Sequence, residues 1–241
     1  MQVLRMIDPG REAAELEPKT LVEAIYKQIR QDVLSGKLKP GSKLRFTDLK
    51  ANYDAGTSTL REALSRLTAD RLVTAEGQRG FRVAPISLTE LWDITKLRSE
   101  IESAALADAI DAGNDAWEAN ILACLHRLSK YEERDATTPA LLGEEGALLH
   151  KLFHMSLLSA CPSVWRLRVV DLLYDQSERY RRLQTSYLPD YRNSPQEHRE
   201  LMEATIGRHK QRAVALLTLH LEKTAQSLST VEELWGSEAR R

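Results

Sequence analysis

The segment at residues 49–72, with the sequence LKANYDAGTSTLREALSRLTADRL, constrains the fold of this chain more than any other part. Three of its leucines recur at helical spacing: Leu60, Leu64 and Leu67. One face of a helix at residues 58–69 is therefore expected to be buried. The corner before this helix contains Gly56, a residue that a tight turn between two helices often needs. The segment is interpreted as the second half of a helix-turn-helix.

The opposite face of this predicted helix carries hydroxyl and guanidinium groups: Thr57, Ser58, Thr59, Arg61, Ser65 and Arg66. The one carboxylate among them belongs to Glu62. Hydroxyls and arginines near the start of a helix suit phosphate oxygens and guanine edges, which favours contact with DNA. An ordinary amphipathic helix with a solvated polar face explains the same pattern equally well. The neighbouring segments decide between the two interpretations.

Charge is unevenly distributed along the chain, although the formal net charge is only −1. Residues 19–85 contain 13 Lys and Arg against 7 Asp and Glu, a net charge of +6. The first 18 residues have a net charge of −2, and the remainder has −5. Basic charge concentrated in one small domain is typical of polyanion binding, so we expect double-stranded DNA to be the partner of this part.

A winged helix-turn-helix is predicted at residues 19–85, preceded by an arm at residues 1–18. Three helices are expected before the wing, at residues 20–35, 47–52 and 58–69. Two β-rich segments follow at residues 72–75 and 81–84, and the turn between them contains two glycines and Arg79. A basic hairpin in this position is expected to touch the DNA groove next to the one that the third helix enters.

The remainder of the chain, residues 86–236, is predicted to be an all-helical effector and dimerisation domain. Its helices are expected near residues 88–112, 114–134, 139–160, 163–187, 195–207 and 210–235. Ser87 and Glu90 form a capping box at the first helix, in which each side chain satisfies a free backbone amide. The predicted fold class is therefore mainly α, a winged helix-turn-helix followed by a helical bundle.

Nothing in the sequence predicts a membrane partner or a disulfide framework. No apolar run approaches the roughly 18 residues of a membrane span, and the first residues lack the apolar core of a secretory signal. The two cysteines, Cys124 and Cys161, are too few for a disulfide scaffold. The expected compartment is a reducing cytoplasm.

Four of the six histidines lie on helix faces that are predicted to point inward: His150, His154, His198 and His220. His150 and His154 are four residues apart, so they project from one helix side by side. A single such histidine is most often a core residue bonded to a neighbour, but a core rarely buries four without a purpose. Because imidazole is a favoured ligand of divalent transition metals, the four could hold one ion inside a helical bundle.

Arg98 lies at helical spacing from apolar residues, which places its guanidinium on the apolar side of a predicted helix. An isolated buried charge requires an anion. A pair with Glu102 one turn further on, or an extended side chain that reaches the surface, would serve equally well. Arg179 and Tyr180 have a similar position on a later helix.

The runs SGKLKPGSKL, TLREALSRLTADRLV and RGFRV resemble the N-terminal domain of GntR-type bacterial transcription regulators over roughly residues 20–85. The family usually has Ser-Arg-Thr-Pro at residues 56–59, so Thr57 stands at the first family arginine, whereas Arg61 matches the second. Arg45 is expected to supply a compensating contact. The residues expected to contact DNA are Arg45, Thr57, Ser58, Thr59, Arg61, Arg79 and Gly80. Two-fold dimers of such domains bind roughly palindromic operators.

The runs LRSEIESAALADAI, LHKLFHMSLLSAC and QEHRELMEATIGRHKQRAVALLTLHLE are similar to the all-helical FCD effector domain of the FadR subfamily, over roughly residues 88–235. Many members bind a metal through an aspartate, a histidine four residues later and two further histidines. The matching positions here are His150, where aspartate would stand, His154, His198 and His220. A histidine at the first position resembles the subgroup around the carbon-starvation-induced regulator.

The FCD resemblance implies a divalent transition metal, with zinc as the first expectation and nickel or manganese as alternatives. It also implies a small organic acid as effector, because a carboxylate can bind a metal with one oxygen and an arginine with the other. The residues expected to bind this effector are Arg98, Arg179 and Tyr180.

Taken together, these features predict a cytoplasmic, homodimeric and metabolite-responsive transcription regulator that acts as a repressor. One alternative is a metal-dependent small-molecule enzyme. A zincin helix has a glutamate as general base next to its first histidine, whereas this chain has Lys151 there. The other alternative is a metal sensor, in which the metal itself is the signal.

Overall fold

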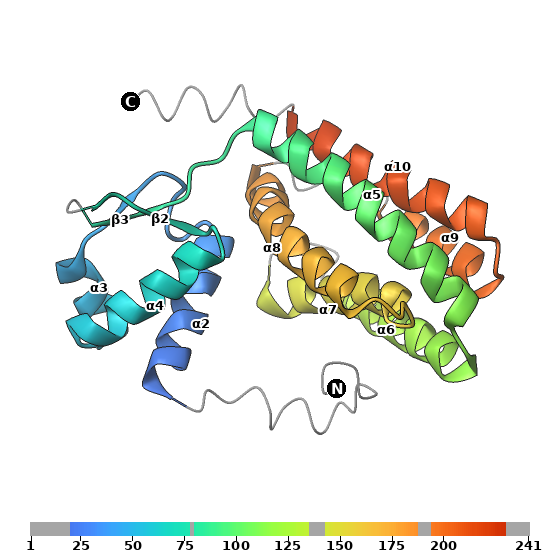
Figure 1. Cartoon of the computed structure of the whole chain (residues 1–241), viewed down its shortest axis with the longest axis horizontal. Helices are drawn as coiled ribbons and strands as arrows, with labels where there is room; N and C mark the ends of the chain where they lie inside the picture. Colours follow the sequence, from blue (N-terminus) through green and yellow to red (C-terminus); the bar gives the residue numbers. More distant parts are fainter. Residues whose placement is uncertain (1–19, 78–79, 135–142, 188–193, 230–241) are drawn as a thin grey trace. The chain divides into compact units, whose positions relative to one another are not determined.

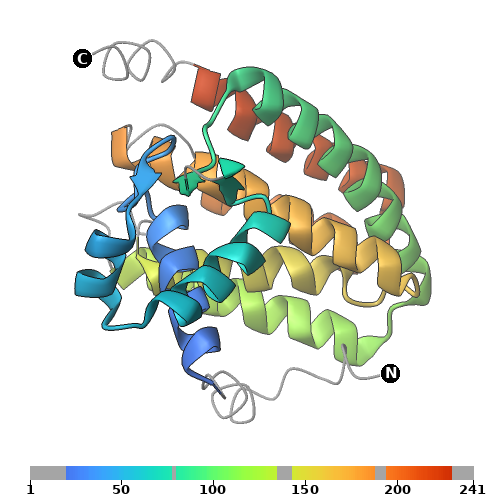
Figure 2. The same cartoon turned by 60° about the vertical axis from the view of Figure 1, so that its left-hand side comes forward.

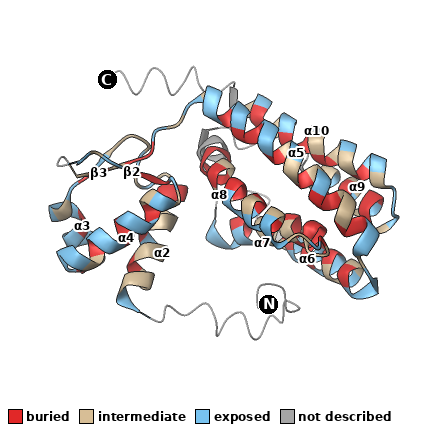
Figure 3. Cartoon of the chain, in the orientation of Figure 1, coloured by how far each residue is buried: buried red, intermediate tan, exposed pale blue. Residues whose placement is uncertain are grey.

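The computed structural model describes residues 20–77, 80–134, 143–187 and 194–229 (Figure 1). They belong to two compact units, of which the first ends at Pro85 and the second begins at Ile86. Each unit has its own apolar core, and buried residues follow the inner faces of its helices (Figure 3). Within the described ranges, no helix is both long enough and apolar enough to cross a membrane.

The first unit consists of three helices and a small antiparallel sheet. Its elements are α2 (Leu21–Leu34), β1 (Lys43–Leu44), α3 (Phe46–Tyr53), α4 (Thr57–Ala69), β2 (Val73–Ala75) and β3 (Phe81–Val83). The three predicted helices and the hairpin are confirmed to within about two residues. The strand β1 was not predicted, because two residues are too few to show the alternation that identifies a strand. It completes the sheet in the order β1-β3-β2.

Apolar side chains of α2 and α4 build the core of this unit. Ile29 of α2 is fully buried, as are the three predicted leucines of α4. Thr20 caps α2, since its hydroxyl accepts a hydrogen bond from the backbone amide of Glu23 at 3.2 Å. Packing against α2 buries the apolar face of α4 and leaves its polar face outward.

The turn between α3 and α4 differs from the expectation in one respect. The residue in the left-handed conformation is Asp54, with φ +45°, whereas Gly56 is extended, with φ −67°, at the start of α4. Asp54 can take this role because a short polar side chain tolerates the left-handed region better than most. The prediction that Gly56 makes the sharp corner was therefore wrong.

The second unit is entirely helical in its described part. Its helices are α5 (Leu88–Ala112), α6 (Asp115–Arg134), α7 (Glu144–Leu158), α8 (Val164–Tyr187), α9 (Ser194–Ile206) and α10 (Lys210–Ser229). They agree with the six predicted helices, except that residues 139–142 and 230–235 lie outside the described ranges. α5 lies beside α10 and α8, and α6 lies beside α7 (Figures 1 and 2).

Only half of the predicted capping box forms at the start of α5. The hydroxyl of Ser87 accepts a hydrogen bond from the backbone amide of Glu90 at 3.1 Å, as expected. The Glu90 carboxylate instead accepts a hydrogen bond from the hydroxyl of Tyr180 on α8 at 2.5 Å. The same hydroxyl accepts a hydrogen bond from the backbone amide of Ser87 at 3.3 Å. A tertiary contact thus replaces the reciprocal local one.

Candidate metal centre and nucleic-acid interface

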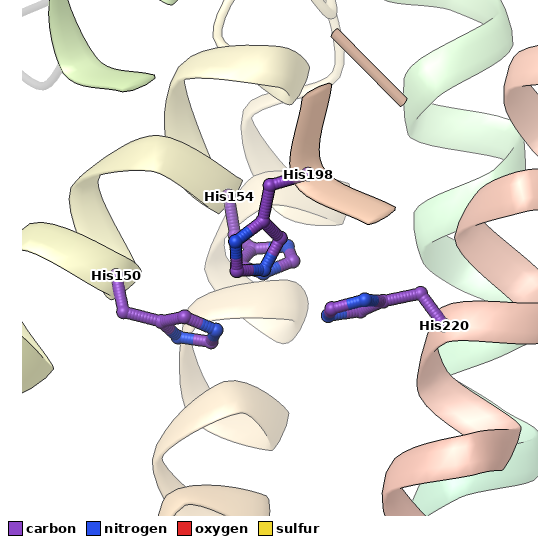
Figure 4. Close-up of side chains that lie close together, drawn as sticks. All are labelled: His150, His154, His198 and His220. Carbon is purple, nitrogen blue, oxygen red and sulfur yellow. The ribbon is translucent and has the colours of Figure 1, made fainter. Parts of the chain in front are cut away.

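The four predicted histidines come together in the second unit. His150 and His154 project from successive turns of α7, His198 comes from α9 and His220 from α10, and their rings converge (Figure 4). Each can place one ring nitrogen so that all four nitrogens lie within 4.8 Å of one another. None of the four residues is more than 7% exposed. This arrangement brings four potential ligand atoms to one buried point.

Hydrogen bonds on two of the rings define which nitrogen faces the centre. Nδ1 of His150 lies 2.6 Å from the hydroxyl of Tyr174 on α8. Nδ1 of His220 lies 3.0 Å from a carboxylate oxygen of Glu197, whose other oxygen pairs with Lys223 at 3.0 Å. Since Nδ1 is engaged in both rings, Nε2 would be the coordinating nitrogen of each. Outer hydrogen bonds of this kind orient metal-binding imidazoles in known metal sites.

His154 supports a metal at this point independently. Neither of its ring nitrogens has a hydrogen-bond partner within the described part of the chain, although the residue is only 3% exposed. A buried polar group without a partner is costly, typically by about 1–3 kcal/mol. A metal ion bound to this imidazole would remove that cost. The donor set therefore fits a transition metal.

The charge state of the cluster also suits coordination. Burial lowers the pKa of His150 well below its ordinary value, and the positive charges of His154 and Arg181 lower it further. Burial likewise lowers the pKa of His154, and His220 and His198 add to the effect. Both imidazoles are therefore neutral near pH 7, which leaves their lone pairs free to bind a cation.

Arg98, the first predicted effector residue, lies beside this centre. Its Nε donates a hydrogen bond to Glu102 at 2.6 Å, and a terminal nitrogen donates to the hydroxyl of Ser177 at 2.5 Å. The guanidinium carbon lies 5.1 Å from the ring centroid of Tyr174. Arg98 thus forms the local pair that the sequence allowed and also contacts the tyrosine that holds His150.

Arg179 and Tyr180, the other predicted effector residues, lie on α8 close to the start of α5. Tyr180 is fully buried and bonded to Glu90 as described above. The pKa of Arg179 is lowered by burial and raised again by the neighbouring Tyr180 and Glu90, so these three residues are close together. The residues of α8 that face the histidines are Tyr174 and Arg181.

Tyr174 and Arg181 were not predicted, because α8 buries charged residues on more than one face. Tyr174, Glu178 and Arg181 recur at helical spacing, but Arg179 and Arg182 next to them are equally buried. A strongly amphipathic helix would have revealed its inner face, and this one does not. The spacing of Tyr174 with Glu178 and Arg181 was the signal that could have indicated them.

The predicted DNA contacts of the first unit lie mostly at its surface. Thr57, Ser58 and Arg61 are exposed on α4, and Arg45 is exposed at the start of α3. The first turn of α4 has no acidic residue and no side-chain cap, so its backbone amides remain available to a phosphate. Thr59 is partly exposed, Gly80 precedes β3 with φ +98°, and Arg79 lies outside the described residues.

Arg61 makes an aromatic contact that its position in the sequence did not predict. Its guanidinium carbon lies 5.3 Å from the ring centroid of Phe46, the first residue of α3. Phe46 in turn packs edge to face against Phe81 of β3, with 6.3 Å between ring centroids. The exposed arginine is therefore supported by a ring that is anchored in the sheet.

Comparison with known families agrees with both units. The family described as bacterial regulatory proteins of the gntR family matches residues 21–83, and the FCD domain matches residues 93–223. The solved structure of E. coli McbR/YncC has the same fold, with a TM-score of 0.72 at 18% identity over 88% of this chain and 99% of that chain.

Two relatives in sequence are transcription regulators. The uncharacterized HTH-type transcriptional regulator BphR of Paraburkholderia xenovorans (strain LB400) is 38% identical over 89% of this chain and 86% of its own. The HTH-type transcriptional repressor GlaR of Escherichia coli (strain K12) is 37% identical over 81% of this chain and 90% of its own. The chain therefore belongs to the GntR family of bacterial transcription regulators, with an N-terminal winged helix-turn-helix and a C-terminal FCD domain, and is not an enzyme.

Proposed function

We propose that this regulator is a homodimeric, metal-containing repressor whose DNA binding is controlled by a small carboxylate. The observation that carries the proposal is the convergence of four buried imidazoles, with nitrogens within 4.8 Å of one another. The similarity to GlaR, which is named a repressor, supports the direction of regulation. Because its partner is the operator DNA, the protein would act in the cytoplasm.

The metal ligands in this proposal are His150, His154, His198 and His220. Four neutral imidazoles leave the +2 charge of a divalent ion uncompensated, whereas the aspartate usual at position 150 would cancel one unit. Imidazole ligands suit zinc, copper and nickel, whereas manganese prefers oxygen ligands. We therefore place zinc first and nickel second. When bound, the ion would supply an electrophilic anchor for one oxygen of a carboxylate.

The effector in this proposal lies between the histidines and the nearby face of α8. Arg98 and Arg181 both contribute positive charge there, since each lowers the pKa of His154. An anion bound between a cation and an arginine is stabilised by both. Arg179 and Tyr180, which were predicted to bind the effector, are instead proposed to hold the start of α5. The effector can shift the equilibrium between two conformations of the regulator only if it binds one of them more tightly than the other.

The operator is proposed to be a roughly palindromic duplex bound by two copies of the first unit. Arg45, Thr57, Ser58, Thr59 and Arg61 would contact it through α3 and α4, and Arg79 and Gly80 would contact it through the wing. In a symmetric dimer, two such surfaces meet half-sites about one helical turn apart. In this proposal, the DNA-binding domain comprises residues 19–85 and the effector and dimerisation domain comprises residues 86–236.

One set of measurements on the purified full-length chain tests the whole proposal. A duplex selected from random DNA should bind in a salt-dependent manner, because phosphate contacts release counterions. The metal content after purification should be one ion per chain, and its removal by a chelator should abolish the response of DNA binding to carboxylates. Absence of any salt-dependent DNA binding would refute the proposal.

A metal sensor remains the second candidate, and the all-imidazole donor set favours it. With no carboxylate ligand, the site would bind a metal by nitrogen donors alone, and the affinity of such donors depends strongly on which ion is present. Titrating DNA affinity with zinc, first without and then with a carboxylate, separates the two candidates. A full response to zinc alone would favour the sensor.

A further inference from the structure

Tyr174 of α8 contacts both His150 of the histidine cluster and two cations, Arg98 and Lys151. It is only 3% exposed, and its hydroxyl lies 2.6 Å from Nδ1 of His150. Within the described residues, this is the one hydrogen bond that the hydroxyl makes. The direction of that hydrogen bond depends on which nitrogen of His150 carries the proton.

Without a metal, the phenol is the donor. A neutral imidazole carries one proton, on either Nδ1 or Nε2, and the phenol carries one as well. If the phenol donates to Nδ1, its proton has an acceptor and the imidazole proton is on Nε2. The opposite direction would leave a buried phenol proton with no acceptor among the described residues, which costs about 1–3 kcal/mol.

Coordination reverses this hydrogen bond. His150 would hold a metal ion through Nε2, because its Nδ1 faces Tyr174. The proton of His150 would then be on Nδ1, where it can only donate to the phenol oxygen. The proton of the phenol therefore needs a new acceptor. No proton is gained or lost by the pair in this exchange, since only the positions of two protons change.

The surroundings of Tyr174 favour an anionic ligand as the acceptor of the phenol proton. The ring lies 5.1 Å from the guanidinium carbon of Arg98 and 5.5 Å from Nζ of Lys151. The acidic groups near it are already paired, because Glu178 accepts two hydrogen bonds from Arg181, and Asp175 pairs with Lys151 at 2.8 Å. A carboxylate oxygen next to the metal would accept the phenol proton, and the positive charge of the ion would stabilise that carboxylate.

We infer that Tyr174 is a conditional hydrogen-bond donor, which becomes available to a bound carboxylate only when the four-histidine site holds a metal. Tyr174 is thereby a positioning residue that couples the affinity for metal to the affinity for the effector. Such coupling is reciprocal, so a carboxylate would also tighten metal binding. The inference rests on the proposed metal site.

This coupling depends on the histidine at position 150. An aspartate there would accept a hydrogen bond from the phenol whether or not a metal is present, because a carboxylate has no proton to return. The exchange of donor and acceptor therefore belongs to chains with an imidazole at this position. It gives the replacement of aspartate by His150 a function beyond coordination.

The first test reads the position of the proton on His150 directly. Long-range proton–nitrogen NMR spectra of the ¹⁵N-labelled full-length protein distinguish the two tautomers, and the variant His150→Gln identifies the signals. We expect the proton on Nε2 in the metal-free protein and on Nδ1 after addition of zinc. A proton on Nδ1 in both states, with zinc bound, would overturn the inference alone. Failure to bind zinc at all would refute the proposed function as well.

The second test measures the coupling, with acetate and succinate as probes. In the zinc-loaded protein, Tyr174→Phe should weaken binding of the probe that wild type binds by about tenfold, because a hydrogen bond to a charged group is lost. In the metal-free protein, the same change should have little effect. Tyr131→Phe removes a hydroxyl from a partly buried tyrosine of α6 and serves as the matched control. Equal losses with and without zinc, or no loss, would contradict the inference.

Discussion

The two units of this protein place their charged groups in opposite ways. In the first unit, the described core is purely apolar, and Arg45 before α3 and the arginines of α4 lie at the surface. In the second unit, the interior holds four histidines, four arginines and two glutamates, and every buried polar or charged residue that the structure describes belongs to this unit. This difference indicates that the first unit presents its charged groups to external partners, whereas the second keeps its own in the interior.

A purely apolar core suits a unit whose function lies on its surface. Stability then comes from burial of leucine, isoleucine and valine side chains, each worth about 1.5–3 kcal/mol, and surface residues are free to match DNA. The second unit gives up part of this stability, because buried charges are expensive unless paired. Its carboxylates accordingly bind arginines, as Glu178 binds both Arg181 and Arg182. An interior with buried charged residues suits a domain that recognises a polar ligand.

The largest expected effect tests whether the surface of the first unit acts separately. Arg61→Ala should reduce affinity for a selected operator about a hundredfold or more, since a bidentate contact to guanine is worth about 1–3 kcal/mol and a dimer makes it twice. Zinc content and oligomeric state should not change. Arg66→Ala on the same helix removes an exposed guanidinium that pairs with Glu62 and is not among the proposed contacts, so it is the control and should have a smaller effect. Equal DNA affinity of Arg61→Ala and wild type would exclude this role.

The second effect tests whether the interior of the second unit is organised around a metal. Wild type should gain about 2.7 kcal/mol of unfolding free energy when free zinc is a hundred times its Kd, and His154→Ala should gain much less. His126→Ala removes an exposed histidine of α6 and should behave as wild type. Thermal denaturation with and without zinc measures both. Zinc stabilisation of His154→Ala equal to wild type would show that the cluster is a polar core and not a metal site.

The sequence predicted the first unit and the histidine cluster well because both depend on spacing. The leucines of α4 and the pair His150 and His154 show the helical period directly. Contacts between helices far apart in the sequence could not be predicted in this way. The hydrogen bond from the hydroxyl of Tyr180 to Glu90 at the start of α5 is one example, and effector binding by Tyr180 stays a prediction. The corner formed by Asp54 was missed because backbone conformation, not side-chain pattern, determines it.

A smaller effect tests how independent the surface of the first unit is from its core. Phe46→Leu should weaken operator binding a few-fold, because an exposed cation–π contact is worth about 0.5–1 kcal/mol per copy. Phe46→Tyr keeps the ring under Arg61 and should restore most of the affinity. The salt dependence should be unchanged in both variants, since the phosphate contacts remain. If Phe46→Leu and Phe46→Tyr bound the operator equally well, the ring would have no part in positioning Arg61.

The last effect concerns Glu132 on α6, a carboxylate of the second unit without the tight pairing seen for Glu178. Burial raises its pKa to about 7, and the charge of Arg199 opposes this only partly. A carboxyl whose pKa is higher in the folded than in the unfolded state favours folding at low pH and loses this contribution as the pH rises from about 4.5 to about 7. Glu132→Gln cannot ionise, so the difference in melting temperature between the variant and wild type should grow in favour of the variant over that interval.

Thermal denaturation at pH 5 and pH 8 measures this difference, with the exposed Glu133→Gln as control. A difference that does not change with pH would mean that this carboxyl is well solvated, and the contrast between the two units would then be confined to the fully buried groups around the histidines.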